Sequence, residues 1–268
     1  ISQATPRLTD ESMLRGIDAI RALLAFAAPF SPQQTIAVAT SAVRDAQNGA
    51  DFRALVRAKT GLELRILSGD EEANLVGRGL LCDPALATLH DFYVFDLGGG
   101  SLECLSFRGR RIAQAASLKL GCVRLTETVV VDASGPLPAG TARAIEDRVG
   151  RALVGNYDFS LPAGTVAVGT GGTITTVRAI LAARAGCALE LTDADVAVDQ
   201  LRLLAAELGA LSLADRQRIA GLPAARADVF PVALLTLVAL AGLGGFPSYR
   251  HSFYNLRFGL AAHALGVA

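Results

Sequence analysis

The segment 92–103 combines acidic residues with a run of glycines, and this combination suits the binding of a phosphate group. An apolar run ends in Asp96, three glycines follow, and a second apolar run begins with Ser101 and Glu103. Consecutive glycines let the backbone take positive φ angles, so that several amides can point at one anion. Asp96 cannot bind that anion directly, but it could hold a divalent cation that does. From these residues alone, a structural glycine turn with a capping aspartate is an equally good interpretation.

Two further features favour a binding site. Ser101 and Glu103 are two residues apart, so on a strand their side chains leave the same face, beside the Asp96 loop. A second glycine-rich segment, 169–173, follows a short predicted strand and begins a predicted helix. Such a junction can bind phosphate or ribose at the helix N-terminus, although many use glycine only for tight packing.

The elements that must position these residues follow an α/β pattern. Strands with crossover helices come first, and helices are expected to dominate after about residue 185, which indicates an α/β fold. The periodicity predicts helices over about 9–28, 50–59, 71–81 and 139–157, and a further one that follows the 169–173 segment and ends near 185. It predicts strands over 35–39, 62–67 and 165–168, and a hairpin from 92–107 and 112–118.

Composition excludes several classes of protein. The chain has 268 residues, 51% of them apolar, which is enough for a large core. With 25 basic and 25 acidic residues the net charge is zero, so nothing indicates bulk nucleic-acid binding; Lys59 and Lys119 are the only lysines. Four scattered cysteines without a C-x-x-C pair favour a reducing cytoplasm.

The stretch 229–248 carries no charge and must be weighed as a membrane span. Pro231 near its start and the glycines and proline near its end leave about a dozen helical residues, whereas a span needs about 20. We expect a helix buried in the core, and no membrane partner.

Seven blocks of the sequence carry a further signal through their order and spacing: 39–48, 67–73, 96–103, 120–127, 169–173, 226–228 and 256–259. Together they resemble the exopolyphosphatase/guanosine pentaphosphate phosphatase (Ppx/GppA) family, in a short form without further C-terminal helical domains. The resemblance implies an α/β, two-domain actin-like fold (ASKHA, ribonuclease H-like) with an interdomain cleft. Domain I would be 1–70, completed by a C-terminal helix over 257–268, and domain II would be 71–256.

The resemblance also implies roles for particular residues. Glu72 matches the general base, and Asp96 and Glu103 match the acidic residues that hold Mg²⁺ and the scissile phosphoryl group. The catalytic groups would lie on both domains, so domain closure is expected. The implied phosphate-binding residues are Arg44, Gly98, Gly99, Gly100, Ser101, Gly171, Gly172 and Thr173.

Simpler interpretations exist for several of these residues. Glu72 could be a helix N-terminal glutamate favoured by the helix dipole. Arg44 could pair with Asp45 or Asp51, whereas Glu127, Arg124 and Arg226 are expected to hold the fold or the walls of the cleft together. The three histidines are too dispersed to suggest a metal site.

The sequence departs from the family at two places. Relatives open with a D-x-G-[ST]-N-S phosphate loop, and this sequence begins after it, so the first strands of domain I are absent from the sequence as given. We expect the natural protein to carry that loop before Ile1. Phe258 stands where relatives usually have Glu.

The leading functional hypothesis is a Mg²⁺-dependent phosphoanhydride hydrolase. Its substrate would be inorganic polyphosphate, from which it releases terminal phosphate, or guanosine pentaphosphate, which would lose its 5′ γ-phosphate. The alternative is a non-catalytic nucleotide or alarmone sensor, and a kinase of the same fold is a third reading. We expect short polyphosphate or nucleotide to be preferred over long chains, and a homodimer is compatible with the sequence.

Overall fold

The structure is a computed structural model that describes residues 6–267, and the chain divides into two compact units between Glu71 and Glu72. The first residues of the predicted domain I, 1–5, and the end of the predicted C-terminal helix, Ala268, lie outside the described residues. Helix α11 (Leu256–Ala264) belongs to the second unit. The prediction that 257–268 completes domain I stays a prediction.

The first unit packs two helices against a small parallel sheet. Thr9 caps the first helix by accepting a hydrogen bond from the backbone N–H of Ser12, as its side chain predicts. Ile17, Phe52 and Val56 form the centre of its apolar core. Its elements are α1 (Asp10–Ala27), η1 (Ala28–Phe30), β1 (Ala37–Ala39), α2 (Ser41–Arg44), α3 (Gly49–Thr60) and β2 (Leu64–Ile66), with β1 and β2 paired in parallel.

The second unit is built around a six-stranded mixed sheet in the order β5-β4-β3-β6-β8-β7. Strands β3, β6 and β8 are parallel, whereas β4 pairs antiparallel with both β3 and β5, and β7 pairs antiparallel with β8. The strands are β3 (Phe92–Leu97), β4 (Leu102–Arg108), β5 (Arg111–Leu118), β6 (Val166–Thr170), β7 (Asp195–Ala197) and β8 (Ser248–His251).

Helices follow these strands and cover the two faces of the sheet. The long ones are α4 (Gly69–Leu81), α6 (Thr141–Leu153), α7 (Gly171–Ala185), α8 (Val198–Ala210) and α10 (Phe230–Gly244). The short ones are α5 (Cys122–Val129), α9 (Leu213–Arg216), α11, and the 3₁₀ turns η2 (Pro84–Leu86), η3 (Leu189–Leu191) and η4 (Ala224–Arg226).

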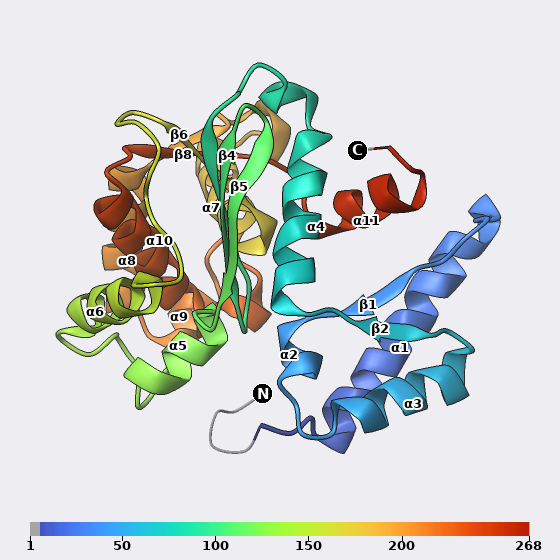
Figure 1. The fold of residues 1–268 in the computed structure, drawn as a ribbon. Helices are drawn as coiled ribbons and strands as arrows, with labels where there is room; N and C mark the ends of the chain where they lie inside the picture. The colour runs from blue at the N-terminus through green and yellow to red at the C-terminus, as the bar shows by residue number, and fades with distance from the viewer. Residues whose placement is uncertain (1–5, 268) are drawn as a thin grey trace. The chain divides into compact units, whose positions relative to one another are not determined.

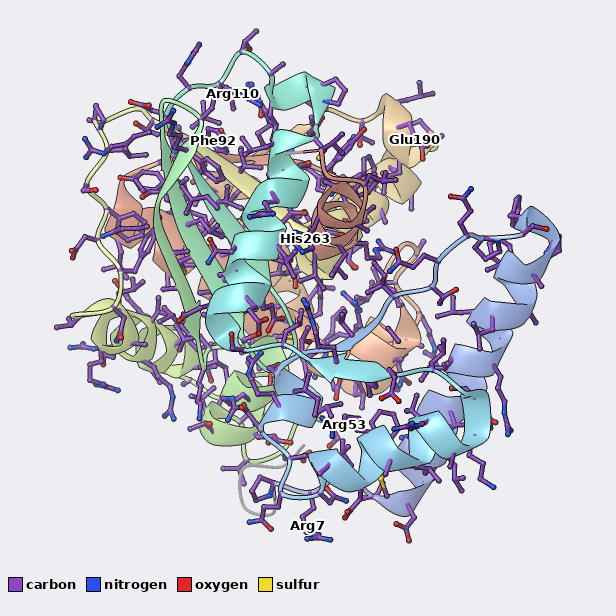
Figure 2. The ribbon with its side chains drawn as sticks, turned by 45° about the vertical axis from the view of Figure 1, so that its right-hand side comes forward. Arg7, Arg53, Phe92, Arg110, Glu190 and His263 are labelled. Atoms are coloured by element: carbon purple, nitrogen blue, oxygen red, sulfur yellow. The ribbon has the colours of Figure 1, made fainter. Side chains whose placement is uncertain are left out.

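Each face of the sheet buries its own apolar core. Helix α4 covers one face and runs antiparallel to β3, with α11 beside it (Figure 1). His263 of α11 lies next to α4, where its Nδ1 is 3.1 Å from Nη1 of Arg78 (Figure 2). Helices α6, α7, α8 and α10 contribute to the larger core on the other face.

The uncharged helix α10 is buried in this larger core, which confirms the prediction for that stretch. Across residues 6–267, no helix is both long and apolar enough to cross a membrane.

Helices dominate after residue 185 as predicted, but the sequence analysis did not predict the two short strands β7 and β8. Strand β8 lies inside the sheet, between β6 and β7, although its sequence Ser-Tyr-Arg-His is short and half polar. Only Tyr249 and His251 of β8 are buried. This segment is a strand because it pairs with β6, about 80 residues earlier in the chain. The local sequence pattern does not predict it.

Candidate active site

Two apolar stripes on adjacent strands each end in a carboxylate. On β3 the residues four and two positions before Asp96 are buried beneath α4, and on β4 the residues two and four positions after Glu103 are buried in the same layer. Because side chains alternate along a strand, Asp96 and Glu103 continue these stripes on the same face. The four apolar residues are Phe92, Val94, Leu105 and Phe107.

Helix α4 brings a third carboxylate to the same end of the sheet. Val76 and Leu80 pack into the layer beneath the helix, and Glu72 lies one turn before Val76 on that stripe. Ser68 and Glu71 start the helix with a capping box: the N–H of Ser68 donates to Oε2 of Glu71 at 2.8 Å, and the N–H of Glu71 donates to Oγ of Ser68 at 3.1 Å. The position of Glu72 in the first turn therefore follows from a local sequence signal.

Burial and neighbouring carboxylates raise the pKa values of Asp96 and Glu103. Asp96 and Glu103 are direct partners across the β3–β4 ladder. Burial, and then the charges of Glu72 and Asp96, raise the pKa of Glu103 to about 8, although hydrogen bonds from Ser117 and Ser101 act in the opposite direction. Burial and the charge of Glu72 raise the pKa of Asp96 to about 6. Within residues 6–267 no arginine or lysine forms an ion pair with Asp96 or Glu103, so this group of acids favours a bound cation or proton.

The glycine loop between β3 and β4 does not use positive φ angles, contrary to the prediction. None of Gly98, Gly99 and Gly100 has positive φ. The close contact depends on Gly121 instead: a Cβ atom on Gly121 would lie 2.3 Å from backbone atoms of Gly99 and Gly100. The loop carbonyls accept hydrogen bonds from the first amides of α5, for example Cys122 N to Gly98 O at 2.9 Å. The carbonyls of all three glycines therefore have partners within the protein, and so does the amide of Gly98, which donates to the carbonyl of Ser101 at 3.0 Å.

Helix α7 begins directly beside Asp96. Thr170, the last residue of β6, is the register partner of Asp96, and Gly171 follows with φ of +80°. A Cβ atom on Gly171 would lie 2.0 Å from Oδ1 of Asp96. The hydroxyl of Thr173 donates to the carbonyl of Leu97 at 2.9 Å and ties the first turn of α7 to β3. The helix N-terminus thus lies against the carboxylate end of the sheet.

A cavity of about 260 Å³ opens between these elements. It is bordered by Asp96, the glycine loop and the first turns of α5, α7 and α10. Arg226 contributes a cation to its wall, because a Cβ atom on Gly172 would lie 2.2 Å from Nη1 of Arg226. Sequence reasoning assigned Arg226 to the walls of the cleft and missed that its guanidinium lies over the start of α7.

The segment that carries Arg226 is held by a second, fully buried arginine. Arg216 has no exposed surface, and burial lowers its pKa. Its guanidinium donates only to backbone carbonyls, which join the turn before α10 to the loop after α5. These are the carbonyls of Ala133, Gly135, Ala227 and Asp228, together with that of Ser212 one turn earlier.

The remaining predicted arginine belongs to the first unit. Arg44 ends α2, where its Nη1 donates to the carbonyl of Leu67 at 3.0 Å and its Nε lies 3.9 Å from Oδ1 of Asp45. Its phosphate-binding role stays a prediction. Arg124 acts as expected on the fold, since its Nε donates to the carbonyl of Gly100 at 3.0 Å.

The structure therefore brings together Glu72, Asp96, Glu103, the glycine loop and the first turn of α7 in one unit. In the sheet, β5, β4 and β3 are antiparallel neighbours, and β6 and β8 continue the sheet in parallel with β3. With acids at the adjoining ends of β3 and β4, this arrangement defines an actin-like (ribonuclease H-like) α/β protein. The chain belongs to the Ppx/GppA phosphatase family, whose model matches residues 2–244.

Solved structures show the same fold. An exopolyphosphatase from Cytophaga hutchinsonii superposes with a TM-score of 0.87 at 24% identity, over 99% of this chain and 86% of that one. The Ppx/GppA family member from Aquifex aeolicus gives a TM-score of 0.77 at 21% identity, over 97% of this chain and 83% of that one.

Proposed function

We propose that this protein is a Mg²⁺-dependent phosphoanhydride hydrolase that releases terminal orthophosphate from inorganic polyphosphate. The single observation that carries the proposal is the meeting of Glu72, Asp96 and Glu103 beside a glycine loop and a helix N-terminus. Membership of a phosphatase family and likeness to an exopolyphosphatase support it.

The acids fit a magnesium ion. No group of three or more His, Cys, Asp or Glu among residues 6–267 could form a metal site by itself. Magnesium is commonly held by one or two carboxylates together with substrate phosphates and water, and Asp96 and Glu103 would supply such a pair. Two adjacent carboxylates with raised pKa values and no cationic partner have the chemistry of this donor set. The bound ion would neutralise charge that develops on the phosphoryl oxygens.

The other groups of the site would position the phosphate and the attacking water. The amides of Gly99 and Gly100 and the first turn of α7 would hold phosphate oxygens. Glu72 would take a proton from the attacking water as the oxygen–phosphorus bond forms and the terminal bridging bond breaks. The products are orthophosphate and a chain that is one phosphate shorter.

We propose guanosine pentaphosphate as a second substrate of the same site. Its 5′ γ-phosphate is also a terminal phosphoanhydride, so the same metal, base and amides would serve. The cavity beside Asp96, with Arg226 in its wall, supports this proposal because it offers room and positive charge close to the reacting group.

The test is phosphate release by the protein with Mg²⁺, from polyphosphate and from guanosine pentaphosphate. We expect Glu72→Gln to lower the rate by about 10²–10⁴-fold while substrate binding persists. Glu71→Gln is the matched control: this exposed neighbour only caps α4, and a glutamine can still accept the hydrogen bond from Ser68. A wild type that binds these ligands yet releases no phosphate would establish the sensor alternative. An unchanged rate in Glu72→Gln would remove Glu72 as the base.

A further inference from the structure

A second concave surface lies at the edge of the sheet in the second unit. It has a volume of about 580 Å³ and is formed by the end of β5, the following residues and the last turns of α6. Strand β5 is the edge strand, next to β4, and α6 lies beside the ends of both strands (Figure 1). We call it the β5–α6 pocket.

The β5–α6 pocket is strongly basic. Lys119, Arg148 and Arg151 line it, and its lining contains no acidic residue. Within residues 6–267 none of these three side chains forms an ion pair or a hydrogen bond. Three unpaired cations around one hollow repel one another, so the arrangement favours a multivalent anion as ligand.

The pocket is connected to the candidate active site through one residue. Ser117 lines the β5–α6 pocket, and its hydroxyl donates to Oε1 of Glu103 at 2.8 Å. Ser117, Glu103 and Asp96 are successive register partners across β5, β4 and β3. The pocket therefore begins two strand spacings, about 10 Å, from Asp96.

We infer that the β5–α6 pocket binds the distal phosphates of a polyphosphate chain whose terminal phosphate lies at Asp96 and Glu103. This inference rests on the proposed function. A linear polyanion without bases fits the pocket better than single-stranded nucleic acid does, because no aromatic side chain lines it and base stacking would have no platform. On this inference a chain that reaches from Asp96 to Lys119 binds more tightly than one that does not, which runs against the sequence-based expectation that short chains are preferred.

The test compares two triple variants that remove equal charge. The pocket variant removes the three positively charged side chains that line the pocket: Lys119→Ala/Arg148→Ala/Arg151→Ala. The control variant removes three exposed arginines outside it: Arg143→Ala/Arg202→Ala/Arg218→Ala. For the pocket variant we expect the KM for chains of tens of phosphates to rise at least 10-fold. Its KM for tripolyphosphate and both kcat values should stay unchanged. The control variant should keep every constant.

Binding without turnover separates this inference from the proposed function. In the Glu72→Gln background, polyphosphate affinity is measured against salt concentration; the pocket variant should lower the slope of log K by about 2, since three phosphate contacts are lost. Length-dependent binding together with no phosphate release by the wild type would refute the hydrolase but keep the pocket. An equal KM rise for both chain lengths, an equal effect of the control variant, or equal competition by single-stranded RNA would overturn the inference.

Discussion

The two ends of the β3–β4 ladder have opposite chemistry, although one register sets both. At one end Phe92 opposes Phe107, and their rings stack with centroids 4.4 Å apart and planes at 6°. Figure 2 shows Phe92 at the upper end of the sheet. Four residues further on the same face, Asp96 opposes Glu103. The register that stacks two rings therefore also forces two carboxylates together.

This difference shows how an unfavourable site is kept in place. Buried carboxylates that repel one another destabilise the folded state, as the raised pKa values of Asp96 and Glu103 indicate. The apolar end, fully buried beneath α4, offsets that cost. Neither strand can slip to separate the acids without breaking the aromatic pair.

Phe92→Ala tests the stabilising end. We expect it to lower the free energy of unfolding by about 3–5 kcal/mol, because it leaves a cavity and removes the ring stack. The measurement is denaturant unfolding. Phosphate release per folded molecule should be nearly unchanged. A loss below about 1 kcal/mol would show that the layer under α4 does not hold the ladder.

The acidic end should make stability depend on pH. In metal-free protein the folded-state pKa values of Asp96, about 6, and Glu103, about 8, exceed the ordinary values of 3.8 and 4.5. The folded state therefore binds more protons between about pH 4 and 8, so the free energy of unfolding falls as pH rises through this range and the loss is complete above about pH 8.

The matched variant is Asp96→Asn/Glu103→Gln, which keeps Glu72 but removes the two titrations. Relative to this variant, the wild type in chelator should lose on the order of 2–3 kcal/mol between about pH 5 and pH 8. Added Mg²⁺ should restore part of that stability at the higher pH. Parallel curves for the two proteins would contradict the mutual repulsion of the acids.

Gly171→Ala tests the close contact between the start of α7 and the carboxylate of Asp96. The backbone at φ of +80° should cost about 1–2 kcal/mol with a Cβ atom, and that atom would collide with Oδ1 of Asp96. Gly155→Ala is the control, since Gly155 has φ of +73° and open space around it. Both should lose similar unfolding free energy, but only Gly171→Ala should reduce phosphate release. Equal activity in the two variants would mean that Asp96 tolerates displacement.

Local patterns predicted the parts of the fold that depend on neighbouring residues. Thr9 capping α1, the start of α4 near Glu71 and the hairpin around Asp96 all follow from spacing within a few residues. The parts that depend on distant partners were missed. Strand β8 exists because β6 pairs with it, and the glycine loop packs so closely on Gly121 that a Cβ atom there would not fit.

The site shows the same division. The sequence by itself determined that Asp96, Glu103 and Glu72 each stand at one end of an apolar stripe, because periods of two and 3.6 residues are local properties. Only the tertiary structure decided that the three stripes end at one point and that Arg226 covers Gly172. It also decided that Lys119 lines the same pocket as Arg148 and Arg151. Apart from the adjacent strands β3 and β4, those relations join residues about 25 to 55 positions apart, and the packing of the sheet layers, which no local pattern encodes, brings them together.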